Sequence, residues 1–185
     1  MRPRNSEIRI VPLGAVDRNL LEYLGLALPE RFNRPCVEMP VKLNIEKAYH
    51  STRRQYHSTQ LLAQLREIGN GEAKILGVTD QDLFIPIFTF VFGEAQVGGG
   101  VALMSTHRLH QEFYGLPEDT RLLFARAEKE AVHELGHTYG LAHCRSFDCV
   151  MHFSNSVEQV DLRPGDFCQS CAARLGDQAG SILAA

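Results

Sequence analysis

The side chains most able to do chemistry lie in residues 133–143, which read H-E-x-x-H-x-x-G-x-x-H. On a helix, His133 and His137 are one turn apart on one face, so both rings can reach a single ion. Glu134 lies beside them, where its carboxylate can take the proton of a metal-bound water. Gly140 lets the chain turn out of the helix, and His143 then supplies a third ligand. Three histidines leave one position of a tetrahedral zinc open, as in hydrolytic sites. The alternatives are surface histidines on an ordinary helix, or a degenerate site without activity.

The sequence before this motif predicts the helix that carries it. Residues 117–120, Pro-Glu-Asp-Thr, supply a turn and a helix cap. Apolar residues then recur at helical spacing on a face that the histidines do not share. These residues are Phe124, Ala127, Ala131, Leu135 and Tyr139.

Four of the five cysteines gather near the C-terminal end as a C-x4-C pair and a C-x2-C pair. Such pairs are typical of a closed structural zinc site with four thiolate ligands. Two disulfides, or unrelated buried thiols, are the alternatives. The four cysteines are Cys144, Cys149, Cys168 and Cys171, while Cys36 stands alone.

The extended glycine-histidine motif resembles that of the metzincin peptidases, which also place a methionine in a tight turn beneath the zinc. Met151, eight residues after His143, is the candidate for this Met-turn. With the four cysteines added, the pattern is similar to the archaemetzincin (archaelysin) signature.

The resemblance implies a zinc metallopeptidase with two Zn²⁺ ions per chain. His133, His137 and His143 would hold the catalytic ion, with Glu134 as general base. The four cysteines would hold a structural ion. The resemblance gives a reaction and no natural substrate, and it leaves endopeptidase or aminopeptidase action open.

Phe153 is a departure from the wider superfamily. Astacins carry a tyrosine two residues after the turn methionine, and phenylalanine has no hydroxyl with which to support an oxyanion. Stabilisation of the transition state would then depend more on the metal. The runner-up hypothesis is a two-zinc scaffold or interaction protein with a vestigial peptidase site, and retention of Glu134 argues against it.

Composition restricts the partners. The 185 residues are 44% hydrophobic and 22% charged, which suits one globular domain with an ample core. A net charge of −3 disfavours nucleic-acid binding. Neither a secretion signal nor 18 consecutive apolar residues can be found, so we expect a cytoplasmic protein without a membrane span. We expect a monomer whose partner is a peptide or protein substrate.

Upstream of the motif, periodicity predicts alternating elements. Strands are expected near Ile8 and Ile10 and at 37–43, 74–78, 85–92 and 97–104, with helices at 20–28, ending at Pro29, and 58–68. This order predicts a mixed α+β fold, a β-sheet with packed helices. The resemblance implies that it forms one metzincin-like catalytic domain over 1–185. Its sheet and helix part would span 1–140, and a Met-turn and zinc-clamped lobe 141–185.

The last of these strands contains Gly98, Gly99 and Gly100, which permit another backbone to approach closely. In metzincins the corresponding edge strand binds the substrate peptide, and we expect Val101, Ala102 and Leu103 to do so here. A glycine turn between two strands of a hairpin is an equally good interpretation of the glycines.

Overall fold

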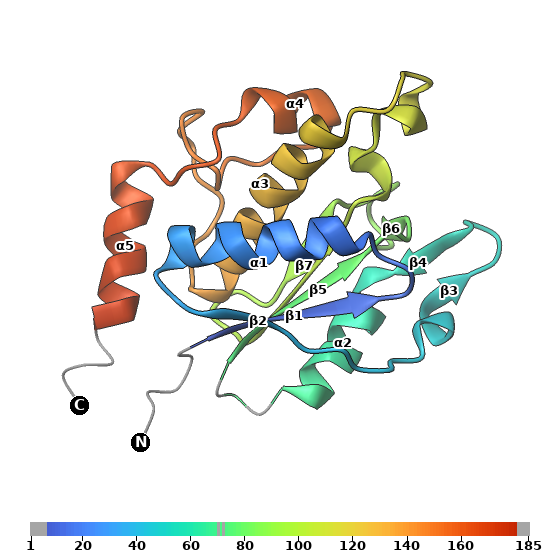
Figure 1. Cartoon of the computed structure of the whole chain (residues 1–185), viewed down its shortest axis with the longest axis horizontal. Helices are drawn as coiled ribbons and strands as arrows, with labels where there is room; N and C mark the ends of the chain where they lie inside the picture. Colours follow the sequence, from blue (N-terminus) through green and yellow to red (C-terminus); the bar gives the residue numbers. More distant parts are fainter. Residues whose placement is uncertain (1–6, 70, 72, 181–185) are drawn as a thin grey trace.

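A five-stranded sheet runs through the computed structural model, which describes residues 7–69, 71 and 73–180 (Figure 1). Residues 1–6, where the sequence predicts no secretion signal, lie outside the described part. The strand order is β2-β1-β5-β8-β7, with β7 alone antiparallel to its neighbour. The strands are β1 (Ile8–Leu13), β2 (Cys36–Glu38), β5 (Lys74–Thr79), β7 (Gly93–Ala95) and β8 (Val101–Ser105).

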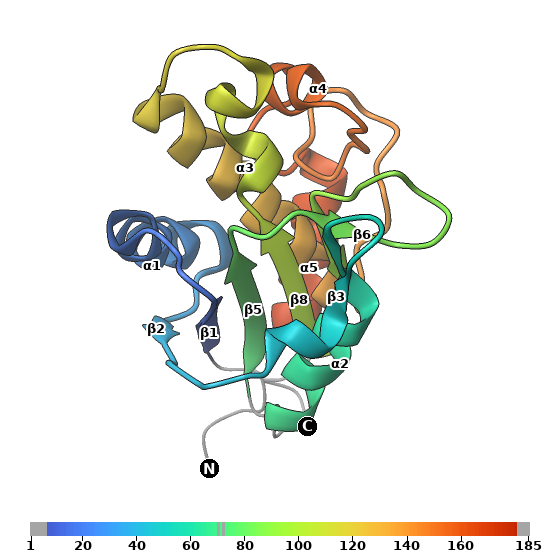
Figure 2. The same cartoon turned by 90° about the vertical axis from the view of Figure 1, so that its right-hand side faces the viewer.

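Helices cover both faces of this sheet (Figures 1 and 2). Helices α1 (Arg18–Phe32) and α3 (Thr120–Thr138) pack against each other, and α3 packs on β8, β7 and β5. Helix α2 (Ser58–Ile68) packs against the same strands from the other side. Because the middle strands are covered on both faces, every residue of β5 and β8 is buried.

The remaining elements are short, apart from the C-terminal helix. A three-stranded sheet joins β3 (Tyr49–His50), β4 (Gln55–His57) and β6 (Leu83–Phe84). The 3-10 helices are η1 (Ile45–Ala48), η2 (His107–Leu109) and η3 (Gln111–Tyr114), and α4 (Val157–Leu162) and α5 (Gln169–Gly180) end the described chain. The predicted mixed α+β class is confirmed. Among the described residues, no helix has the length and apolar composition needed to cross a membrane.

Two apolar clusters stabilise the layers. One lies between the sheet and helices α1 and α3, and it contains Leu24, Leu76 and Leu135. The other lies between the sheet and α2, and it contains Leu61 and Leu103. Alternate residues of β5 serve opposite clusters, since successive side chains of a strand point to opposite faces.

The prediction that the first helix ends at Pro29 is wrong. Helix α1 continues to Phe32 and is capped by Asn33, whose backbone N–H donates to the carbonyl of Pro29 at 2.9 Å. Proline in a helix removes one hydrogen bond and costs about 3 kcal/mol. Packing offsets that cost, because Leu28 is fully buried and the ring of Phe32 stacks on Tyr139 at 5.3 Å.

The apolar run 85–92 is not the predicted buried strand. β6 ends at Phe84, and the run continues as a loop whose Phe88 and Thr89 carbonyls accept hydrogen bonds from the Arg53 side chain at 2.8 and 2.9 Å. The Arg53 side chain thus donates to backbone carbonyls that, in a strand, would accept hydrogen bonds from the neighbouring strand. The loop turns its aromatic residues toward a cavity described below.

The other predicted strands differ mainly in length. The strand expected at 37–43 is shortened to β2, which ends at Glu38 before Pro40. The strand expected at 97–104 begins only at Val101, because Gly98 to Gly100 form the turn between β7 and β8. The hairpin interpretation of the glycines is therefore the right one.

Candidate metal centre and active site

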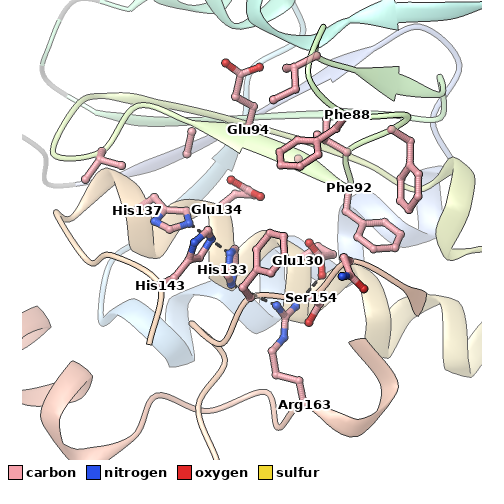
Figure 3. A pocket seen from close by; sticks show the side chains of 18 of the residues that line it. Phe88, Phe92, Glu94, Glu130, His133, Glu134, His137, His143, Ser154 and Arg163 are labelled. Atoms are coloured by element: carbon pink, nitrogen blue, oxygen red, sulfur yellow. Dashed lines mark hydrogen bonds and ion pairs between the residues drawn. The ribbon is translucent and has the colours of Figure 1, made fainter. Parts of the chain in front are cut away.

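Helix α3 brings the first two motif histidines together. The helix begins at an Asp119 cap, whose carboxylate accepts from the backbone N–H of Leu122 at 3.0 Å. It ends before Gly140, whose φ of 80° lies in the left-handed region and turns the chain back. His143 then joins His133 and His137, and the ligand atoms of the three rings all lie within 4.8 Å of one another (Figure 3).

The hydrogen bonds of these rings fit a metal ion between them. Nδ1 of His133 lies 2.8 Å from the carbonyl of Val150, and Nδ1 of His137 lies 2.7 Å from that of Leu141. A carbonyl only accepts, so each Nδ1 carries the proton and each Nε2 presents a lone pair. The two Nε2 atoms face each other at 3.2 Å. Two facing lone pairs repel unless a cation lies between them, so the donor set suits zinc.

Burial keeps the ring nitrogens available to a cation. It lowers the pKa of His133 well below the ordinary value, and the nearby charge of Arg163 lowers it further. The pKa values of His137 and His143 are lowered as well, first by burial. All three imidazoles are therefore neutral near pH 7, the state that binds a metal.

Glu134 lies beside the histidines with only 6% of its surface exposed. Burial raises the pKa of its carboxyl well above the ordinary value, and the charges of Glu130 and Glu94 raise it further. A cation bound by the three histidines would counter this effect and favour the carboxylate. Glu134 is therefore a buried carboxyl group directly beside the three histidines.

A cavity of about 450 Å³ opens beside these residues. One wall is the aromatic loop that precedes β7, which contributes Phe88 and Phe92 to the lining (Figure 3). The other wall is α3 and the segment after the Met-turn, where Phe153 packs edge-on against His143 at 5.1 Å. Since Phe153 brings a ring and no hydroxyl, it adds no hydrogen-bond donor to the site.

The predicted position of the edge strand is wrong by one strand. Val101, Ala102 and Leu103 lie in β8, which pairs with β5 on one side and β7 on the other. Their backbone N–H and C=O groups therefore pair with the neighbouring strands inside the sheet. The edge strand is β7. The sequence pattern does not indicate a strand there, because the residues of β7 are polar or small and only partly buried.

Strand β7 runs directly over Glu134. The carbonyl of Phe92 and the N–H of Gln96 bond inward to β8 at 2.8 and 3.0 Å. The alternation of antiparallel pairing leaves the N–H and C=O groups of Gly93 and Ala95 on the outer side. A side chain at Gly93 would start 2.6 Å from the Glu134 carboxylate oxygen, so only glycine permits this approach.

The turn that contains Met151 lies between the histidine cluster and the cysteine cluster. Met151 is fully buried, and its carbonyl accepts from the backbone N–H of Cys144 at 2.8 Å. The turn is closed by the N–H of His152, which donates to the carbonyl of Cys149 at 2.9 Å. The residue after the third histidine is thereby attached to the turn methionine.

The four clustered cysteines converge on one point. Their sulfur atoms all lie within 4.8 Å of one another, and those of Cys144 and Cys168 are 3.9 Å apart. A tetrahedral zinc with Zn–S bonds near 2.3 Å places its sulfurs about 3.8 Å apart, so the set fits. Hydrogen bonds, first from the Cys171 backbone, lower the pKa of Cys168 to about 7. Cys36 belongs to β2, and burial raises its pKa to about 11.

Sequence reasoning missed three charged residues around the site. Glu130 lies one turn before Glu134 on α3 and forms a buried ion pair with Arg163. Lys74 is 5% exposed and donates to the carbonyls of Gly99 and Thr138, both at 2.7 Å. Only Glu130 had a signal, its helical spacing from Glu134, because the other two reach the site from distant parts of the chain.

Known proteins are similar to this chain in sequence and in fold. The model of peptidase family M54 matches residues 16–177. An archaemetzincin from Methanocaldococcus jannaschii is 41% identical over 175 residues, covering 92% of this chain and 93% of the relative. The crystal structure of archaemetzincin from Archaeoglobus fulgidus, 42% identical, has a TM-score of 0.80 over 91% of this chain and 99% of that one. A zinc-dependent peptidase from Methanocorpusculum labreanum, 29% identical, has the same TM-score and coverage. The chain therefore belongs to peptidase family M54, the archaemetzincins, and is a zinc metallopeptidase.

Proposed function

We propose that the protein hydrolyses a peptide bond in a substrate that lies as an extra strand along β7. His133, His137 and His143 hold the catalytic zinc, and Glu134 is the general base. The observation that carries this proposal is the position of the Glu134 carboxyl between the three histidines and the free edge of β7. A bound zinc supplies a Lewis acid that polarises the scissile carbonyl and makes water more acidic.

The residues of the chain bind the substrate, transfer the proton and exclude water. The outer N–H and C=O groups of Gly93 and Ala95 pair with the substrate backbone and fix its direction. Glu134 takes the proton of the attacking water and returns it to the leaving amine. The aromatic loop and Phe153 border the cavity with apolar surface, which excludes water from the reacting groups.

We also propose a second, structural zinc, bound by Cys144, Cys149, Cys168 and Cys171, which makes two ions per chain. The convergence of the four sulfurs supports it. Thiolate ligands require reduced cysteines, so a cytoplasmic location remains our proposal. A monomer that binds peptides, without nucleic acid or membrane, remains the working hypothesis.

A peptide-library digest tests this function. Glu134→Ala should retain both metals by elemental analysis and lose about 10²- to 10⁴-fold in turnover, the typical contribution of a positioned base. Unchanged turnover would remove Glu134 from its role. A wild-type protein that binds two zinc ions and cleaves no peptide would instead support the scaffold hypothesis.

A further inference from the structure

A buried ion pair lies directly beside His133, the first of the three histidines. A guanidinium nitrogen (Nη2) of Arg163, in the segment after α4, donates to the Glu130 carboxylate at 2.6 Å. Their side chains are 2% and 4% exposed. Both residues border the cavity, and Figure 3 shows the guanidinium between Glu130 and His133.

Arg163 also contacts the Met-turn and a histidine. Its second terminal nitrogen (Nη1) donates to the carbonyl of His152 at 3.0 Å and lies 3.2 Å from Nδ1 of His133. That Nδ1 already donates its proton to the carbonyl of Val150, so the guanidinium packs against the ring without a hydrogen bond to it. The Arg163 side chain therefore links Glu130 on α3 to the Met-turn. The same turn accepts the hydrogen bond from Nδ1 of His133.

Stability alone does not account for this pair. Desolvation of two buried charges cancels most of their attraction, and buried pairs can often be replaced by apolar residues without loss. Apolar residues cannot, however, replace the two donor nitrogens of the Arg163 guanidinium, which bind the Glu130 carboxylate and the His152 carbonyl at the same time.

We propose that Arg163 and Glu130 are positioning residues, which hold the Met-turn at a fixed distance from α3 and so keep His133 in the orientation that binds the metal. This inference rests on the proposed function of the three histidines. Partners behind the first ligands of a metal typically contribute 10- to 100-fold in metal affinity or activity.

The test replaces both charges at once, because a single substitution would leave an unpaired charge buried. In the double variant Arg163→Met with Glu130→Leu, we expect a wild-type unfolding temperature and a zinc dissociation constant at the histidine site raised roughly 10- to 100-fold. Chelator competition measures affinity, and cobalt substitution separates the sites because thiolate and histidine ligands give different absorption bands.

The matched control is the pair Arg126 and Asp161, which also joins α3 to α4. Arg126 is 4% exposed and donates to both carboxylate oxygens at 2.7 Å, with no contact to a histidine of the site. Arg126→Met with Asp161→Leu should leave zinc affinity within about twofold.

The conservative variant Arg163→Lys keeps the charge and loses the fork. It should weaken zinc binding to an intermediate degree, and it supplies the measurement if the double variant does not fold. Wild-type affinity at the histidine site in the folded double variant, or in Arg163→Lys, overturns this inference and leaves the proposed function intact. A wild-type protein whose histidines bind no metal overturns both.

Discussion

Replacing Gly93 by alanine tests whether β7 is placed for catalysis. An added Cβ would lie 2.6 Å from a carboxylate oxygen of Glu134 and 2.6 Å from the backbone carbonyl of Leu103. Ordinary contacts begin near 3.4 Å, so the atoms must separate by about 0.8 Å. The Leu103 carbonyl is part of the interior strand β8 and cannot yield, so either β7 moves outward or Glu134 is pushed aside.

Both movements disturb the reacting geometry. A misplacement near 1 Å can cost about 10²-fold, so we expect kcat/KM for a fluorogenic peptide to fall roughly 100-fold, about 2.7 kcal/mol of transition-state stabilisation. Overpacking should also lower the free energy of unfolding by about 1–3 kcal/mol. Metal content should be unchanged, because the added methyl group points at Glu134.

Gly100 provides the control in the adjacent turn. An alanine there would meet only the carbonyl of Ala73, at 4.0 Å. Gly100→Ala should therefore retain wild-type kcat/KM and unfolding temperature. The reasoning is refuted if Gly93→Ala folds with its zinc and is as active as Gly100→Ala.

Three further predictions concern other parts of the molecule. Cys149→Ser should lose the structural zinc and lower the thermal unfolding temperature, and a protein that kept two zinc ions by elemental analysis would contradict the four-cysteine site. Lys74, whose pKa burial lowers from 10.5 to about 8, is harder to protonate in the folded protein than in the unfolded chain. This penalty is fully present below pH 8 and disappears as pH rises to 10.5, so wild-type stability should gain relative to Lys74→Met between pH 7 and 10 in denaturant titrations. A gap that stays constant with pH would show that the Lys74 pKa is not lowered. Leu76→Ala, at a fully buried position of β5, should cost about 2–5 kcal/mol in the same titrations, and a cost near zero would contradict its place in the core.

The parts of the site that are local in sequence could be predicted. Helical geometry alone fixes the relation of His133, Glu134 and His137, and Gly140 indicates where the chain leaves the helix. The helix at 58–68 likewise follows from local periodicity and the glycine after it, and the strand at 74–78 follows from its apolar run; both are found.

The parts that depend on distant contacts could not be predicted. The run 85–92 has the composition of a buried strand, but the side chains of Arg53 and Gln55, far back in sequence, donate to its Phe88 and Thr89 carbonyls. The residues of β7 show no apolar pattern, because an edge strand that borders a cavity does not have to bury apolar side chains. Arg163 looks like any arginine until folding places it behind His133.

The Met-turn connects the histidine cluster to the cysteine cluster. A tight turn has few internal hydrogen bonds and is held mainly by what its residues contact. Here consecutive residues of one turn serve different neighbours. The sulfur of Cys149 joins the cysteine cluster, the carbonyl of Val150 holds His133, that of Met151 binds Cys144, and that of His152 binds Arg163. The segment between Gly140 and α4 has little regular structure, so it is held mainly by such contacts, and the cluster of four cysteines begins directly after the third histidine.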